Sequence, residues 1–107
     1  MKIFLTGTSG LLGSNTAREL LKRGYQIRGL FRHESEAALL ERHDNFEVFF
    51  GDITDSRKMQ EGVNGCNAVI HAAADTGLWP ARSREYIATN VTGTINVMEA
   101  AKKARVR

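Results

Sequence analysis

Three glycines at three-residue intervals near the start of the chain constrain its fold more than any other feature. Residues 6–13 read Thr-Gly-Thr-Ser-Gly-Leu-Leu-Gly, and they separate an apolar run at residues 2–6 from a helical pattern at residues 11–23. Glycine accepts the backbone conformations of a tight turn and leaves backbone N–H groups open to a ligand. A helix start adds unsatisfied N–H groups and the positive end of the helix dipole. The pattern therefore predicts a strand–turn–helix unit that binds a diphosphate.

Each glycine of this loop has its own expected role. Gly7 takes the tight turn out of the strand, Gly10 leaves room for a pyrophosphate, and Gly13 allows the helix to pack close to the strand. Three such glycines alone are also compatible with a turn that binds nothing, but their place between the first strand and the first helix favours binding. The same binding contacts are expected from three further loop residues: Ser9, Leu11 and Leu12.

After the loop, strand patterns alternate with helix patterns. Strands are expected at residues 25–31, 46–50 and 68–74, and helices at residues 35–43, 83–105 and from Asp55 to between Gly62 and Gly65. This alternation predicts a parallel sheet with helices on both faces. Two right-handed crossovers in one direction, followed by a reversal, give the strand order 3-2-1-4. The expected fold class is α/β, a doubly wound parallel sheet forming one domain over residues 1–107.

Two helices have apolar residues at helical spacing, which predicts the face that each turns toward the sheet. For the first helix this face is expected to contain Leu12, Thr16, Ala17, Leu20 and Leu21. For the long helix it is expected to contain Ile87, Val91, Thr94, Ile95, Met98 and Ala101.

Composition and charge exclude several classes of function. The net charge is +3, and the cluster Lys102, Lys103 and Arg105 closes the last helix, where cations are stabilised by the helix dipole. No basic stripe with stacking aromatic residues is present, which argues against nucleic-acid binding. No apolar run approaches the ~20 residues that cross a bilayer. The single cysteine, Cys66, excludes an internal disulfide, and we expect a cytoplasmic protein without a membrane partner.

Four motifs, taken in chain order, resemble the extended short-chain dehydrogenase/reductase family. They lie at residues 6–13, 51–55, 65–74 and 90–101, and they are similar to the family's cofactor loop, adenine-contacting turn, fourth-strand signature and long-helix signature. The family includes sugar-nucleotide epimerases, dehydratases and dihydroflavonol-reductase-like enzymes. The resemblance implies the N-terminal part of a Rossmann-type NAD(P)-binding domain, with four strands of an incomplete sheet.

The resemblance also implies cofactor contacts at the ends of the third and fourth strands. Asp52 would accept a hydrogen bond from the adenine amino group, and the backbone and side chain of Ile53 would border the ring. An acidic turn former is the alternative for Asp52. Ala72, Ala73 and Ala74 would leave space for ribose and phosphates, or serve tight packing, or both.

His71, Asn90 and the loop at residues 76–79 are expected to have structural or substrate-side roles. His71 is expected to be a core or hydrogen-bonded residue. Asn90 would satisfy backbone groups near a helix kink or hold a water, and is a weaker candidate for cofactor contact. Residues 76–79 would border a substrate pocket, although packing of Trp79 over the sheet edge is an equal alternative.

The end of the second strand favours NADP, with NAD as the alternative. Relatives that bind NAD place an acid there to hold both ribose hydroxyls, whereas residues 29–33 read Gly-Leu-Phe-Arg-His. Arg32 would meet a 2′-phosphate through charge-assisted hydrogen bonds worth about 1.5–3 kcal/mol, roughly a tenfold to hundredfold preference. Glu34 and Glu36 lie close, and stacking of Arg32 on the adenine is the other interpretation.

The catalytic pair that the resemblance implies is missing. The family uses a tyrosine that is activated by a lysine four residues later, but Tyr25 and Tyr86 are followed at that spacing by glycine and asparagine. The three histidines show no metal-ligand spacing. We expect no catalytic residue here, and we expect the cofactor-binding part, inactive alone, of an NAD(P)-dependent oxidoreductase or epimerase acting on a hydroxyl or carbonyl substrate. The alternative is a non-catalytic dinucleotide-binding regulatory or scaffold module.

The fourth strand predicts self-association. A strand as apolar as residues 68–74 is expected to be paired on both sides, and long apolar edges invite pairing between molecules. We therefore expect the chain to be part of a longer polypeptide, and to form a homo-oligomer through the fourth strand or the long helix.

Overall fold

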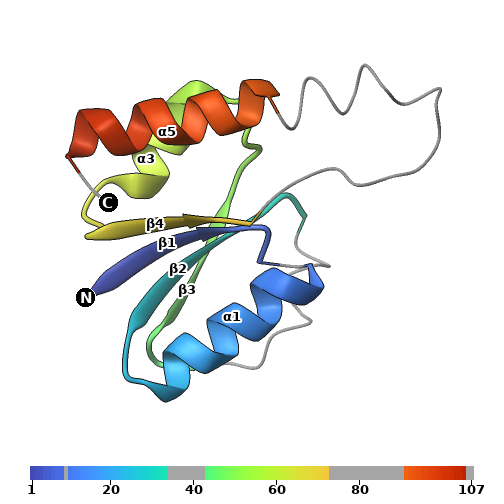
Figure 1. Ribbon diagram of the computed structural model, residues 1–107, viewed down its shortest axis with the longest axis vertical. Coiled ribbons are helices and arrows are strands. Elements are labelled where there is room, and N and C mark those ends of the chain that lie inside the picture. Colours follow the sequence, from blue (N-terminus) through green and yellow to red (C-terminus); the bar gives the residue numbers. More distant parts are fainter. Residues whose placement is uncertain (9, 34–42, 73–90, 106–107) are drawn as a thin grey trace, which may run out of the picture.

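The computed structural model describes residues 1–8, 10–33, 43–72 and 91–105, and its strands form one parallel sheet (Figure 1). The strands are β1 (Lys2–Thr6), β2 (Gln26–Phe31), β3 (Phe46–Phe50) and β4 (Ala68–His71), in the order β3-β2-β1-β4. The predicted α/β class and the 3-2-1-4 order are confirmed. The strand positions agree within one residue, except that β4 ends at His71; Ala73 and Ala74 lie outside the described residues.

The strand order places the reversal of the chain between β1 and β4. The first two connections lead from β1 to β2 and on to β3, and the next connection returns to the other side of β1. The registers pair Phe4 with Arg28 on one side and with Val69 on the other. In open parallel sheets, ligands bind at the carboxyl ends of the strands beside such a reversal. The fold therefore directs attention to the ends of β1 and β4.

The helices cover both faces of the sheet (Figure 1). α1 (Leu11–Lys22) lies on one face, and α3 (Ser56–Val63) and α5 (Gly93–Ala104) lie side by side on the other. The predicted cap of α3 is confirmed, because the Asp55 carboxylate accepts a hydrogen bond from the Lys58 backbone N–H at 3.1 Å. The predicted helix at residues 35–43 and the predicted start of the long helix lie outside the described residues, save His43. No helix in the described part of the chain is long and apolar enough to cross a membrane.

Two apolar clusters fill the spaces between the layers, because neighbouring residues of a strand point to opposite faces. The cluster beneath α1 contains Ile3, Leu5, Ala17 and Ile27. The cluster beneath α3 and α5 contains Phe4, Leu30, Ile53, Met59, Val63, Cys66, Val97 and Ala100.

The buried face of α1 agrees with the prediction except at Leu12. Its fully packed residues are Gly13 and Ala17, Leu20 and Leu21 are half-buried, and Leu12 is 70% exposed. The reason is the short distance between helix and sheet, because a Cβ on Gly13 would lie 1.9 Å from the Gly7 carbonyl oxygen. Small residues must occupy the closest positions, so the helix is turned away from the orientation that would bury Leu12.

The buried face of α5 departs from the prediction for the same reason. Gly93, Val97 and Ala100 are buried, and these residues pack against the cluster that contains Ile53 and Met59. Three residues predicted to face the sheet are exposed instead, by 52%, 53% and 66% respectively: Val91, Ile95 and Met98. Val91, just before α5, and Ile95 and Met98 within it thus form an outer apolar stripe, called here the outer stripe of α5.

A charged clamp joins the strands to α3 near the opposite, amino-terminal edge of the sheet. Arg28 Nη1 donates to the carbonyl oxygens of Gly62 and Asn64, both at 2.7 Å, where α3 ends. Its Nε donates to Glu47 Oε2 at 3.1 Å, and Lys2 Nζ lies 2.8 Å from the same oxygen. The hydrogen bond from Lys2, with support from Arg28, lowers the pKa of Glu47 despite partial burial. Positively and negatively charged side chains thus connect the strands to the end of α3 at this edge.

Candidate functional site

The glycine loop forms a closed turn that leads directly into α1. Gly7 has φ +72°, a conformation that glycine adopts without strain, and the Gly10 N–H donates to the Gly7 carbonyl at 3.0 Å. Gly10 is the N-cap of α1, and it brings no side chain to cap the helix. The helix itself leaves the first N–H groups, those of Leu11, Leu12 and Gly13, without an intrahelical partner. The backbone thus presents donors and the positive dipole end at the carboxyl end of β1.

Gly10 and Gly13 meet different surroundings. A Cβ on Gly13 would lie 1.9 Å from the Gly7 oxygen and 2.5 Å from its carbonyl carbon, so only glycine fits there. A Cβ on Gly10 would lie 3.4 Å from the Gly7 oxygen, which is an ordinary contact. Packing inside the chain therefore requires glycine at position 13 and accommodates a small side chain at position 10.

Thr8 supports the loop from within, a role that the sequence analysis missed. Its side chain is fully buried, and its hydroxyl donates to the Leu5 carbonyl at 3.0 Å. It packs against Gly29 of β2, where an added Cβ would lie 3.0 Å from Thr8 Cγ2 and 2.8 Å from Phe46 Cζ. The sequence signal was a glycine inside a strand, which often marks a close approach. Ser9, the next loop residue, lies outside the described residues.

The turn after β3 is ordered by Asp52. One carboxylate oxygen, Oδ1, accepts hydrogen bonds from the backbone N–H and the hydroxyl of Thr54, at 3.0 and 2.9 Å. This is the turn-forming role given as the alternative for Asp52. A carboxylate has a second oxygen, so the turn role and an adenine contact are compatible.

Ile53 faces the core rather than an open surface. Its side chain is 5% exposed, and its Cδ1 would lie 2.4 Å from a Cβ on Gly93 of α5. Its carbonyl oxygen accepts a hydrogen bond from Asn96 Nδ2 at 3.0 Å. α5 therefore holds this turn in place, and any contact of Ile53 with an adenine ring would come mainly from its backbone.

A hydrogen-bonded chain joins the ends of β1 and β4 to α5. Thr6 Oγ1, which is fully buried, lies 2.6 Å from His71 Nδ1, and His71 Nε2 lies 3.0 Å from Thr94 Oγ1. The Ala72 N–H donates to Thr6 Oγ1 at 3.1 Å. Burial lowers the pKa of His71, which favours the neutral ring. His71 is thus a hydrogen-bonded residue, as expected, and half-buried Ala72 lies directly beside the strand ends.

Of the remaining residues expected near the cofactor or substrate, the structure describes only Arg32. Arg32 follows the last residue of β2 and is exposed at the carboxyl-terminal edge. Glu34, Glu36, Ala73, Ala74, residues 76–79 and Asn90 lie outside the described residues.

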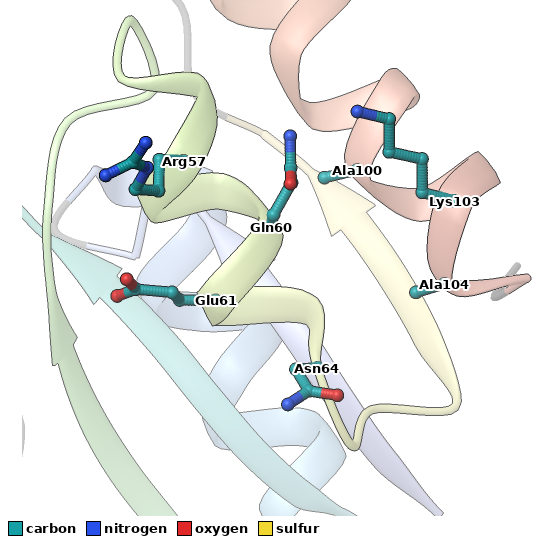
Figure 2. A pocket seen from close by; sticks show the side chains of 7 residues that line it. All are labelled: Arg57, Gln60, Glu61, Asn64, Ala100, Lys103 and Ala104. Atoms are coloured by element: carbon teal, nitrogen blue, oxygen red, sulfur yellow. The ribbon is translucent and has the colours of Figure 1, made fainter.

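Two hollows on the surface lie apart from these residues. Figure 2 shows one of about 350 Å³ between the later turns of α3 and α5, where Gln60 points toward α5 and Lys103 lies on the opposite rim. A second, of about 430 Å³, lies beside α1 and Tyr25. Neither contains a residue of the glycine loop or of the turn after β3. These two hollows are therefore not part of the candidate site.

Comparisons with known proteins agree with this geometry. The sequence model of the NAD dependent epimerase/dehydratase family matches residues 3–107. Sterol demethylase protein B of Methylococcus capsulatus is 34% identical over 107 residues, which make up 100% of this chain and 32% of that protein. The 4-hydroxy-2-methyl-3-oxo-4-farnesyl-3,4-dihydroquinoline-1-oxide ketoreductase of Stigmatella aurantiaca is 37% identical, over 100% of this chain and 31% of that protein.

Solved structures with bound cofactor show the same fold. The Bordetella bronchiseptica enzyme WbmH, in complex with NAD+, matches with a TM-score of 0.85 and 32% identity, over 98% of this chain and 36% of that chain. This chain spans about a third of the length of the relatives that it matches. The chain belongs to the NAD dependent epimerase/dehydratase family.

Proposed function

We propose that this chain is the cofactor-binding part of an NAD(P)-dependent oxidoreductase or epimerase that acts on a hydroxyl or carbonyl substrate. The carrying observation is the glycine loop, in which Gly7 turns the chain, Gly13 touches the Gly7 carbonyl, and the N-cap of α1 is Gly10, which has no side chain. In this proposal the N–H groups of Leu11, Leu12 and Gly13 donate to the diphosphate of the cofactor.

Other contacts complete the proposed site. Asp52 accepts a hydrogen bond from the adenine amino group, and Ile53 borders the ring through its backbone. Ala72 leaves room for ribose and phosphate at the end of β4, together with Ala73 and Ala74. Asp52, Ile53 and Ala72 are supported by their place along the carboxyl-terminal edge of the sheet. Ser9, Ala73 and Ala74 are supported by the sequence pattern alone.

Arg32 is proposed to select NADP over NAD. It stands exposed at the end of β2, where an acid would bind the two ribose hydroxyls in an NAD-specific protein. A 2′-phosphate gains a guanidinium partner there, which predicts a roughly tenfold to hundredfold preference for NADP. Titration with both cofactors tests the proposal, because tighter binding of NAD, or an unchanged NADP affinity in Arg32→Ala, would contradict it.

The chain alone is proposed to bind cofactor without turning over substrate. When bound, the nicotinamide supplies or accepts a hydride at C4, and this chain's residues hold the other half of the cofactor. The tyrosine–lysine pair that the family resemblance implies is not found at the required spacing in the sequence. The measurement is a spectrophotometric assay of NADPH oxidation with carbonyl substrates, and turnover by the purified chain would refute inactivity.

Binding itself is tested best with Gly10→Ala. The added methyl makes only an ordinary contact with the Gly7 oxygen, so the chain should fold, but the methyl would stand between α1 and the diphosphate. We expect NADPH affinity to fall at least tenfold, measured by calorimetry. Asn15→Ala, on the exposed side of α1, is the matched control and should bind normally. Wild-type protein that binds neither cofactor would refute the proposed function.

Self-association is proposed through β4 or α5. Within the described residues β4 pairs with β1 alone, and the outer stripe of α5 exposes Val91, Ile95 and Met98. A second copy that covers this stripe would remove apolar surface from water. Sedimentation should show a dimer or larger species that Ile95→Glu dissociates, and a monomer at all concentrations would contradict the proposal.

A further inference from the structure

The hydrogen-bonded side chains of Thr6, His71 and Thr94 lie near the ends of β1 and β4, where the order of the strands reverses. Thr6 and His71 are the last register pair of β1 and β4, the two strands on either side of the reversal. The ring of His71 spans from Thr6 Oγ1, at 2.6 Å from Nδ1, to Thr94 Oγ1, at 3.0 Å from Nε2. Three elements that are far apart in the sequence therefore meet at one imidazole.

The bridge fixes the groups nearest to the glycine loop. Thr6 directly precedes Gly7, and its hydroxyl oxygen also accepts the N–H of Ala72 at 3.1 Å. The position of Thr6 therefore fixes both the start of the glycine loop and the end of β4. The far nitrogen of His71 connects this point to the first turns of α5 through Thr94.

A neutral imidazole suits this bridge better than an apolar ring would. It has one N–H donor and one bare acceptor nitrogen, and a hydroxyl can serve either, so both tautomers satisfy the two threonines. An apolar residue of similar size would fill the space without fixing the distance between the strand ends and α5.

A second tether from α5 holds a different part of the edge. Asn96 Nδ2 donates to the Ile53 carbonyl at 3.0 Å, in the turn after β3. Thr94 and Asn96 thus connect one helix to two regions: the ends of β1 and β4, and the turn expected to receive the adenine. This division allows the two tethers to be tested against each other.

We propose that His71 is a positioning residue for the cofactor diphosphate, acting through Thr6 on the glycine loop and held in place by Thr94. The inference rests on the proposed function, because it assigns a role within the same site. His71 acts by fixing the backbone donors, so its loss should weaken the contribution of the diphosphate and leave the adenine contribution unchanged. Loss of the Asn96 tether should weaken the contribution of the adenine and leave that of the diphosphate unchanged.

The experiment compares AMP with ADP, which carries the additional phosphate of the diphosphate. Affinities of the 107-residue chain for both probes are measured by NMR titration in wild type, Thr94→Val, Thr94→Ser and Asn96→Ala. In Thr94→Val the ratio of ADP to AMP affinity should fall about threefold to tenfold, the size expected for one lost hydrogen bond. Thr94→Ser should restore the ratio. In Asn96→Ala the affinity for AMP should fall by a similar factor.

Controls separate positioning from general loss of structure. Thr92→Val removes a hydroxyl from an exposed residue just before α5, where the side chain makes no capping bond, and should leave both affinities unchanged. His71→Asn should lower the ADP to AMP ratio in the same direction as Thr94→Val. An unchanged ratio in folded Thr94→Val, or equal losses for both probes, would overturn the inference while the proposed function stands. Wild-type protein that binds neither probe would instead overturn the proposed function, and the inference with it.

Discussion

α1 and α3 both begin at the carboxyl-terminal edge of the sheet, but different groups occupy their first turns. At α3 the Asp55 carboxylate accepts the Lys58 N–H at 3.1 Å and places a negative charge at the helix start. At α1 the N-cap is Gly10, without a side chain. A carboxylate would compete with a phosphate for the same N–H groups and repel it, so the capped helix serves the fold and the uncapped helix is available to an anion.

The largest expected effect comes from closing the gap between α1 and β1. Gly13→Ala would place a methyl 1.9 Å from the Gly7 oxygen, and backbone atoms on both sides must move apart. We expect the free energy of unfolding to fall by about 3 kcal/mol, the upper end for overpacked sites. Urea denaturation measures it. Gly10→Ala is the control, and its free energy of unfolding should fall by less than about 1 kcal/mol. Equal losses in the two variants would show that the short distance between position 13 and the Gly7 carbonyl does not cause the loss.

The comparison is tested most directly by giving α1 the cap of α3. In Gly10→Asp the new carboxylate would occupy N–H groups of the first turn and oppose the phosphate charge. We expect cofactor affinity to fall about a hundredfold or more, while the free energy of unfolding changes by less than about 1 kcal/mol. Calorimetry and urea denaturation give the two numbers. Cofactor binding at wild-type strength would mean that the diphosphate binds elsewhere.

The reciprocal change removes the cap of α3. Asp55→Ala should lower the free energy of unfolding by about 1 kcal/mol, because the Lys58 N–H loses its acceptor. Cofactor affinity should stay within about twofold of wild type, since Asp55 is not among the residues proposed to touch the ligand. Thermal denaturation and calorimetry check both statements. Lys58→Ala keeps the backbone N–H that Asp55 accepts. If it lowers the free energy of unfolding as much as Asp55→Ala does, an interaction between the two side chains, rather than the cap, would explain the loss.

The smallest expected effect concerns pH and the His71 bridge. Burial lowers the pKa of His71 below its ordinary 6.5, so the unfolded chain takes up this proton at higher pH than the folded chain does. The contribution of His71 to stability is therefore complete above about pH 6.5 and is lost as the pH falls toward the lowered pKa. The lowered pKa of Glu47 acts in a separate range, below its ordinary 4.5.

Urea denaturation at several pH values measures this loss. Subtracting the curve of His71→Asn, which has no titrating ring at this position, isolates the effect of His71 from that of the rest of the chain. A difference between the two curves that does not vary between pH 7 and pH 5 would contradict the assignment.

The sheet was predictable from the sequence because it depends on local patterns. Apolar runs separated by helical periods located four strands, and the handedness of crossovers ordered them. The packed faces of α1 and α5 were not predictable in the same way. Hydrophobicity favoured Leu12 and Met98 as inward residues, whereas the close contacts of the two helices require glycine at positions 13 and 93.

The candidate site divides along a similar line. The glycine loop and Asp52 carry their signal within a few neighbouring residues, so pattern and resemblance located them. Thr8 and the partners of His71 depend on contacts across the fold: Thr6 and His71 are 65 positions apart, and His71 and Thr94 are 23 positions apart. No local spacing announces such a bridge, because each partner is an ordinary residue in its own element.

The direct contact between position 13 and the Gly7 carbonyl has a consequence for protein engineering. Two peptide units touch here without any side chain between them, so no rotamer sets their separation. β1, the turn at Gly7 and the first turn of α1 therefore form a module in which the main chain sets the distance between strand and helix. Grafted into another parallel sheet, this module should keep its shape while other side chains are exchanged, provided that the host offers a small cavity for the side chain of Thr8 and a hydrogen-bonding partner for the hydroxyl of Thr6.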